Sequence, residues 1–166
     1  MIEAEGSIGL VLGRFQPLHP GHLRLIDTAM QECDEVVVCI GSAQTDEPLT
    51  IEQRCTYLSR QLGELYADKN WRLEEVYNTS DVAVWPQHVK DTCNLESENL
   101  RLYRGNRMPL EDEEKFRKIG FQVFYVSRQA FFYMAPNGLY HKVSSATEIR
   151  AIYESLNVSI ADSLEL

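Results

Sequence analysis

The chain has 166 residues, of which 44% are hydrophobic and 25% charged, values typical of one globular domain with a substantial core. A formal net charge of −9 would repel nucleic acid and anionic membranes, so a phosphate ligand would have to be held by a local group of donors. The longest apolar runs are too short to cross a membrane, and the acidic residues 1–5 lack the basic start of a secretion signal. We therefore expect a cytoplasmic protein.

The four cysteines support this expectation. Cys33, Cys39, Cys55 and Cys93 form no CxxC pair and stand at no zinc-finger spacing from a histidine. We interpret them as reduced packing residues rather than as redox or metal-binding groups.

The first notable stretch follows a short apolar run, residues 8–12, which predicts a buried strand. Residues 13–22 read GRFQPLHPGH and lead into a helical pattern. Pro20 suits the first helical position, which places His19 near the N-cap and His22 one turn on, on the same face. Gly21 would let a ligand approach the backbone closely. Free N–H groups at the helix start, two imidazoles and Arg14 together predict a phosphate site. The structural alternative is that His19 caps the helix and His22 packs.

A second apolar run, residues 35–41, is typical of a parallel strand covered on both faces and completes a βαβ unit. Gly41 and Ser42 then follow at the carboxyl end of a strand, where open α/β sheets bind ligands. Residues 50–53 predict a capping box that opens a second helix, with Arg54 in its first turns. A basic residue is unfavourable there, so Arg54 is either held for an anionic ligand or is a solvated surface residue.

The rest of the chain continues the alternation of strands and helices. We predict a strand over 71–77, a turn over 78–81, a short helix from about Pro86, a polar surface loop over 91–99, a strand over 100–104 ended by Gly105 and Asn106, a helix over 111–119 closed by Gly120, a strand over 121–126, an aromatic and irregular segment over 131–142, and a helix from Ser145 to about Leu156. The last ten residues are predicted to be a weakly ordered tail. The pattern indicates an α/β fold, a mostly parallel sheet flanked by helices, in a single domain over 1–166 with its core at about 8–157 and a tail at 158–166.

A second helix N-terminus suited to bind phosphate lies near the end of the predicted strands and helices. Ser145 and Glu148 have the spacing of a capping box, which alone is a structural feature. Thr147 and Arg150 stand at i, i+3, so a hydroxyl and a guanidinium share one face near the helix N-terminus. Two such helix starts on one chain fit a triphosphate better than either does alone.

These two stretches resemble a known family. GRFQPLHPGH is similar to the GRFQPxHxGH signature of the archaeal-type nicotinamide-mononucleotide adenylyltransferases, within the HxGH nucleotidyltransferase superfamily. Residues 145–150, SATEIR, resemble the family's second signature, Ser-x-Thr-x-Ile-Arg. The resemblance covers most of residues 8–150 and implies a Rossmann-like nucleotidyltransferase fold.

The resemblance also implies a role for each matched residue. His19, His22, Arg14 and Arg150 would be catalytic and would stabilise the ATP phosphates. ATP would be bound by Gly13, Phe15, Gln16, Gly21, Gly105, Asn106, Ser145 and Thr147. The acceptor would be bound by Gly41, Ser42, Arg54 and Trp85, with the indole stacked on a planar base.

The implied reaction is attack of a mononucleotide phosphate on the α-phosphorus of ATP, in line with the leaving pyrophosphate, which gives NAD when the acceptor is nicotinamide mononucleotide. No covalent intermediate is needed, because the protein works by positioning and charge stabilisation. Mg²⁺ would be held mainly by ATP phosphates and water, because the sequence shows no dedicated carboxylate cage. The expected partners are ATP and a mononucleotide, with no nucleic acid and no membrane, and we expect a homo-oligomer.

One position departs from the family. Val82 stands where nicotinamide-specific enzymes often have Asn three residues before the tryptophan, and Trp85 itself could equally be a core residue. The acceptor could therefore instead be FMN, phosphopantetheine or a phospho-alcohol. A non-catalytic nucleotide sensor is a further alternative. A dehydrogenase is disfavoured because no GxGxxG follows a strand, and a P-loop enzyme because GxxxxGK[ST] is missing from the sequence.

Overall fold

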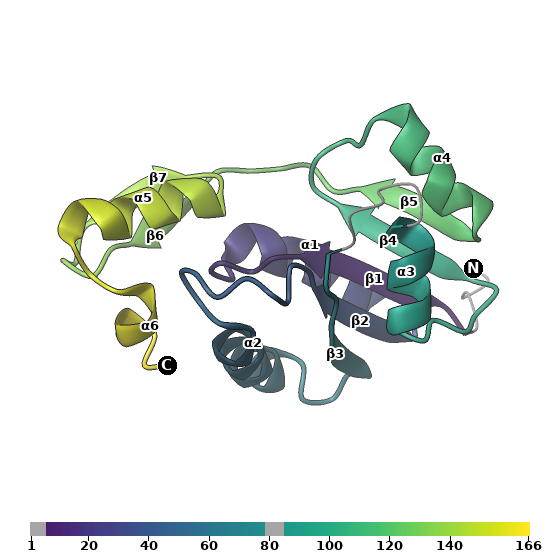
Figure 1. Ribbon diagram of the computed structural model, residues 1–166, viewed down its shortest axis with the longest axis horizontal. Coiled ribbons are helices and arrows are strands. Elements are labelled where there is room, and N and C mark those ends of the chain that lie inside the picture. The colour runs from purple at the N-terminus through teal and green to yellow at the C-terminus, as the bar shows by residue number, and fades with distance from the viewer. Residues whose placement is uncertain (1–5, 79–84) are drawn as a thin grey trace.

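The computed structural model describes residues 6–78 and 85–166, so Val82 lies outside the described residues. Five strands form one sheet: β1 (Ile8–Gly13), β2 (Glu35–Ile40), β3 (Trp71–Glu75), β4 (Leu100–Arg104) and β5 (Phe121–Tyr125). Their order is β3-β2-β1-β4-β5, and every neighbouring pair is parallel (Figure 1). The expected α/β fold with a parallel sheet is confirmed.

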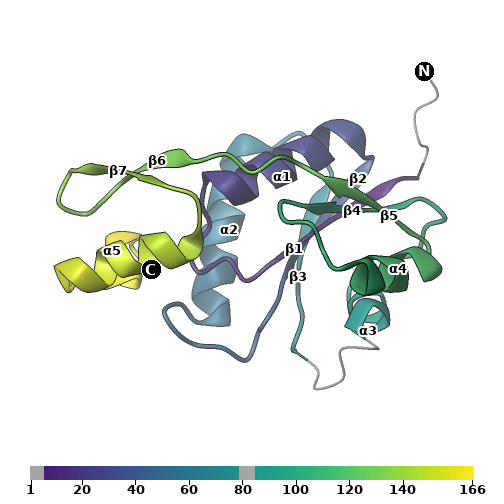
Figure 2. The ribbon, with the colours of Figure 1, turned by 90° about the horizontal axis from the view of Figure 1, so that it is seen from above.

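Four helices cover the two faces of this sheet: α1 (Pro20–Glu32), α2 (Ile51–Leu65), α3 (Trp85–Thr92) and α4 (Leu110–Lys118). Strand side chains alternate between the faces. Leu10 and Leu102 point into the cluster under α3 and α4, whereas Val11 and Tyr103 point into the cluster under α1 and α2. Figure 2 shows α1 across the sheet from α3 and α4. Burial on both faces explains the continuous apolar run of β2.

The strand order reverses at β1, which lies between β2 and β4. The loops that leave the carboxyl ends of β1 and β4 therefore begin side by side but run to different faces. In open α/β sheets this switch point is where a crevice forms and ligands bind. Residues 13–22 and Gly105 both lie there.

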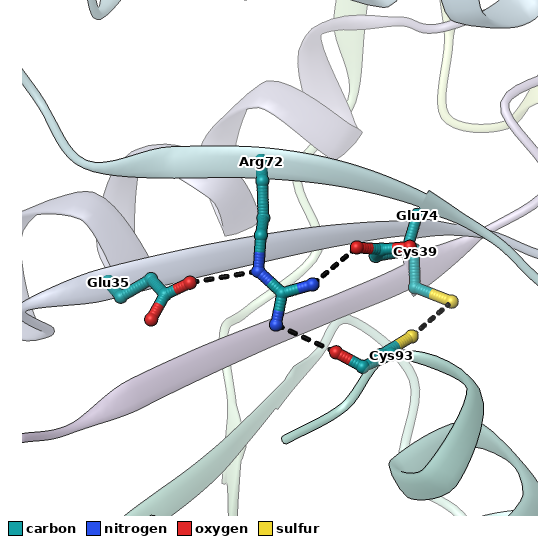
Figure 3. Close-up of polar contacts among 5 residues, drawn as sticks. All are labelled: Glu35, Cys39, Arg72, Glu74 and Cys93. Carbon is teal, nitrogen blue, oxygen red and sulfur yellow. Dashed lines mark hydrogen bonds and ion pairs between the residues drawn. The ribbon is translucent and has the colours of Figure 1, made fainter. Parts of the chain in front are cut away.

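Arg72 joins the edge of the sheet to the segment before β4 (Figure 3). Its Nε is 2.9 Å from a carboxylate oxygen of Glu35 on β2, its Nη1 contacts Glu74, and its Nη2 donates to the carbonyl of Cys93 at 2.7 Å. All four cysteines are free, and the buried thiols of Cys39 and Cys93 pack with their sulfurs 3.4 Å apart. Residues 91–99, expected as a surface loop, instead begin as the end of α3 and bury Cys93 and Leu95.

The segment over 131–142 is a hairpin rather than irregular structure. β6 (Phe131–Met134) and β7 (Tyr140–Val143) pair antiparallel, with Gly138 at a φ of +84° in the turn. Phe131, Tyr133 and Val143 pack against α5 (Ala146–Leu156). The strand pair was not predicted because aromatic residues stand on both of its faces. The sequence therefore lacks the alternation of apolar and polar residues that indicates a strand.

The C-terminal residues also differ from expectation. α6 (Ile160–Ser163) lies where a weakly ordered tail was predicted over 158–166. Ile160 is buried in a third apolar cluster with Leu49, Ile149 and Tyr153, so this short helix is fixed by packing rather than by its own propensity. The hairpin, α5 and α6 form a lobe beside the carboxyl ends of the strands (Figures 1 and 2). Among the described residues, we find no helix long and apolar enough to span a bilayer.

We predict that Ile160→Ala lowers the free energy of unfolding by about 2 kcal/mol, because it leaves a cavity in the third cluster. Val158→Ala, at a more exposed position two residues earlier, is the matched control and should change it by less than about 0.5 kcal/mol. Urea unfolding measures both. Equal, small effects would show that α6 is not packed in solution.

Candidate functional site

Two histidines cap the start of α1. The Nδ1 of His19 accepts from the backbone N–H of Gly21 at 3.0 Å, and the Nδ1 of His22 accepts from the backbone N–H of His19 at 3.3 Å. Pro20 has no N–H, and the N–H groups of His22 and Leu23 both bond to the carbonyl of His19. The expectation of free backbone N–H groups here is therefore wrong, because the imidazoles and the cap carbonyl use them.

This cap fixes what the histidines can offer to a ligand. Since each Nδ1 accepts a hydrogen bond, a neutral ring carries its proton on Nε2, which is then a donor. The two rings stack with centroids 3.7 Å apart, between Phe15 on the His22 side and Phe131 on the His19 side. The site thus presents two adjacent N–H donors on a packed stack of rings.

Both histidines are neutral at neutral pH. Burial, with a smaller contribution from the positive charge of Arg128, lowers the pKa of His19 to about 4. Burial also lowers the pKa of His22 well below its ordinary value, with further contributions from His19 and Arg128. The imidazoles therefore act as hydrogen-bond donors rather than as cations.

Gly21 is required for a reason other than the one expected. A Cβ at this position would lie 2.8 Å from Cε1 and 2.9 Å from Nδ1 of His19. A side chain here would strike the His19 ring, while the glycine itself lines the cavity beside the histidines.

A cavity of about 210 Å³ opens beside the histidine pair, at the switch point between β1 and β4. It brings together five of the expected site residues, which are His19, Gly21, His22, Gly105 and Asn106. Arg128 and Ser144 also line it. The Gly105–Asn106 turn after β4 and the histidine loop after β1 thus share one cavity.

A second pocket, of about 170 Å³, holds another set of expected residues. Arg14, Gln16, Ser42, Arg54 and Arg150 line it, together with Thr45, Glu47 and Pro48. Arg150 connects this pocket to the first loop, because its Nη1 donates to the carbonyl of Gln16 at 2.9 Å and its Nη2 to Thr147 Oγ1 at 3.1 Å. The two candidate catalytic arginines therefore line a different pocket from the two histidines.

Arg54 lies at the base of this second pocket and is 1% exposed, so the solvated alternative is wrong. Its guanidinium donates to five backbone carbonyls, those of Arg14, Gly41, Ser42, Thr45 and Thr50, at 2.7–3.4 Å. A guanidinium has five N–H donors, and here all five are used. In this conformation Arg54 holds the loops after β1 and β2 together instead of presenting a donor to an anion.

Gln16 and Phe15 also support the loop from within. The Gln16 amide accepts from the N–H of Leu49 at 2.9 Å and donates to its carbonyl at 2.8 Å. Phe15, at a φ of +55°, buries its ring beneath Gly13, where a Cβ would lie 3.2 Å from that ring. Gly41 donates to the carbonyl of Gly13 at 2.7 Å, which joins the two loops directly.

The start of α5 is capped by one half of the expected box. Ser145 Oγ accepts from the N–H of Glu148 at 3.3 Å. The Glu148 carboxylate accepts from the N–H and Oγ of Ser144 rather than from the N–H of Ser145. Ser145 and Thr147 thus have structural partners, and Ser144, which sequence reasoning passed over, lines the histidine cavity.

Trp85 begins α3 and is half-buried against the cluster between α3, α4 and the sheet. Its ring centroid lies 5.8 Å from that of His88, and it lines neither of the two pockets above. In this conformation Trp85 packs against the core, as the structural alternative expects.

Arg128 is the functional candidate that sequence reasoning missed. It follows β5 in a segment that matches neither signature, so only the fold brings it to the histidines. A basic residue after the carboxyl end of a strand was the one available signal, and alone it was too common to use.

Residues 10–152 match the family model described as cytidylyltransferase-like. The chain is 36% identical over 86 residues to the nicotinamide-nucleotide adenylyltransferase of Pyrococcus horikoshii, an alignment that covers 49% of this chain and 46% of the relative. It is 37% identical over 87 residues to the enzyme of the same name from Caldivirga maquilingensis, covering 49% of each chain. The matched region spans about half the length of these curated relatives.

Among solved structures, the fold is similar to a bifunctional NMN adenylyltransferase/ADP ribose pyrophosphatase from Francisella tularensis. The TM-score is 0.69 at 20% identity, over 92% of this chain and 43% of that one. A second structure of the Francisella protein, complexed with AMP and a manganese ion, gives a TM-score of 0.65, also at 20% identity and with the same coverage of both chains. This likeness shows the nucleotidyltransferase fold.

We predict that Arg54→Lys lowers the free energy of unfolding by about 2 kcal/mol, because three ammonium donors cannot satisfy five carbonyls. Arg60→Lys, exposed in the same helix, is the matched control and should have little effect. Denaturant unfolding without substrates measures both. Unchanged stability in Arg54→Lys, with a raised KM for the acceptor alone, would instead favour direct phosphate binding.

Proposed function

Since the chain belongs to the cytidylyltransferase-like family, we propose that it is an adenylyltransferase that moves AMP from ATP to nicotinamide mononucleotide, giving NAD and pyrophosphate. The observation that carries this proposal is the His19–His22 pair, whose Nδ1 atoms cap the helix and which lines the cavity at the switch point of the sheet. The names of the archaeal relatives support the choice of acceptor.

In the proposed reaction the acceptor phosphate attacks the α-phosphorus of ATP, and pyrophosphate leaves from the opposite side. His19 and His22 donate through Nε2 to the phosphate oxygens on which charge builds up, and they do so without gaining a proton. We assign Gly105 and Asn106 to the adenine, and Ser145, Thr147 and Arg150 to the β- and γ-phosphates. Arg150 lines the second pocket, so it would reach these phosphates from the acceptor side rather than from the histidine cavity. Gly13, Phe15, Gln16 and Gly21 shape the loop that holds these donors in place.

The acceptor side lies in the second pocket. Arg14 is exposed there and neutralises the incoming phosphate, next to Gly41 and Ser42. We assign Arg54 a positioning role, because its five bonds hold the carbonyls of Arg14, Gly41 and Ser42 in place. Trp85 lines neither pocket, and the exposed part of its partly buried ring is the proposed stacking surface for the acceptor base.

The described residues include no group of three or more His, Cys, Asp or Glu side chains that could hold a metal ion. We propose that a magnesium ion arrives with ATP and is held by phosphate oxygens and water. When bound, Mg²⁺ would neutralise charge on the departing pyrophosphate. The protein residues would then bind and orient the two substrates around it.

The proposal is tested by pyrophosphate release from ATP and Mg²⁺ with a panel of acceptors: nicotinamide mononucleotide, its acid form, FMN and phosphopantetheine. We expect release with nicotinamide mononucleotide. Release with only FMN or phosphopantetheine would move the chain to another acceptor within the family. No release with any acceptor, while ATP still binds, would favour a nucleotide sensor.

We predict that His22→Asn lowers turnover by ~10²–10³ or more, because it removes a donor placed for the reacting phosphates. Asn can still accept the cap hydrogen bond in place of Nδ1, so the fold is expected to persist. His22→Gln, which places an N–H donor near the position of Nε2, is the matched variant and should lose less. Near-normal turnover in a folded His22→Asn protein would contradict the role of His22.

A further inference from the structure

Arg128 lines the histidine cavity and lies in the segment between β5 and β6. Its side-chain stem packs over Gly105, where a Cβ would lie 3.4 Å from Arg128 Cγ. Its Nη1 donates to Asn106 Oδ1 at 2.9 Å and its Nη2 to the carbonyl of Ser144 at 2.5 Å. Arg128 thereby spans the cavity from the turn after β4 to the residue before the α5 N-cap.

These contacts hold the guanidinium but do not saturate it. A guanidinium has five N–H donors, and the two side-chain contacts above use two of them. The side chain is exposed and lines the same cavity as His19 and His22. Donors therefore remain for an anion that enters beside the histidines.

Charge gives a second, independent reason to place an anion here. The two histidines are neutral. Arg14 and Arg150 line the other pocket, whereas Arg24, Arg104 and Arg128 line the histidine cavity. Arg128 is the cation whose charge acts on both imidazoles. A chain of net charge −9 that binds a polyphosphate needs a full positive charge close to these neutral donors.

We propose that Arg128 is a further substrate-binding residue, which binds the polyphosphate chain of ATP alongside His19 and His22. This inference rests on the proposed adenylyl transfer for the identity of the ligand. Asn106 and the Ser144 carbonyl hold the guanidinium in the cavity, so little side-chain entropy is lost when the phosphates arrive.

The test compares Arg128→Ala and Arg128→Lys with the parent protein in calorimetric titrations with Mg-ATP, AMP and inorganic triphosphate. Lys69→Ala, which removes an exposed positive charge in the turn after α2, is the matched control. We expect Arg128→Ala to weaken binding of ATP and triphosphate by about 10–100-fold and binding of AMP much less. Arg128→Lys should recover part of the loss, and Lys69→Ala should bind like the parent protein.

A readout that does not depend on activity or on ATP follows from the same placement. Removing the positive charge makes protonation of the histidines easier, so Arg128→Ala should raise the pKa of His19 from about 4. Histidine titration by NMR measures this shift. An unchanged His19 pKa would overturn the placement of Arg128 beside the histidines.

The outcomes separate this inference from the proposed function. If the parent protein and Arg128→Ala bind ATP and triphosphate equally, the role of Arg128 is overturned, while adenylyl transfer still depends on the acceptor panel. An equal loss for ATP and AMP would overturn phosphate binding in favour of a role in shaping the cavity. If the parent protein binds neither ATP nor triphosphate, the proposed function and this inference both fall.

Discussion

One buried cation organises the loops around the second pocket. Parallel strands that end at a sheet edge leave their last carbonyls without ladder partners, and buried carbonyls need donors. Arg54 reaches from α2 and supplies five N–H groups to the carbonyls that follow β1 and β2 and to the α2 N-cap. Without this cation the carbonyls of Arg14, Gly41, Ser42 and Thr45 would lose their side-chain donor. The Gln16 amide likewise holds the backbone of Leu49, through one donated and one accepted hydrogen bond.

On the other side of the first loop, the protein replaces backbone donors with side-chain donors. The N–H groups at the α1 N-terminus bond to imidazole Nδ1 atoms and to the cap carbonyl, and the Nε2 atoms carry the donor function outward. The rings reach further from the helix axis than an amide does, and burial keeps them uncharged. Positive charge at this cavity belongs to separate residues, the arginines Arg24, Arg104 and Arg128. Hydrogen bonding and charge thus come from different residues around the first loop.

The sequence was sufficient for features encoded by local pattern. Apolar runs and alternating patterns predicted the five parallel strands, and Pro20, Thr50 and Ser145 predicted three helix starts. It failed where a contact across the fold decides the outcome. The short helix at Ile160 forms because Ile160 packs into the third apolar cluster. Arg54 donates to carbonyls that include that of Arg14, which is distant in sequence. Arg128 lies between the signatures, so no local pattern could assign it a partner.

The cap on α1 also changes how a short His-x-Gly-His match should be judged. Its spacing is that of an N-cap and the third helical residue, and its glycine is the position where a Cβ would strike the first imidazole. Any chain that folds a histidine back over a helix start in this way needs the same pattern, whatever it binds. The glycine is thus a signature of ring packing. Evidence of catalysis has to come from what surrounds the outward-facing nitrogen atoms.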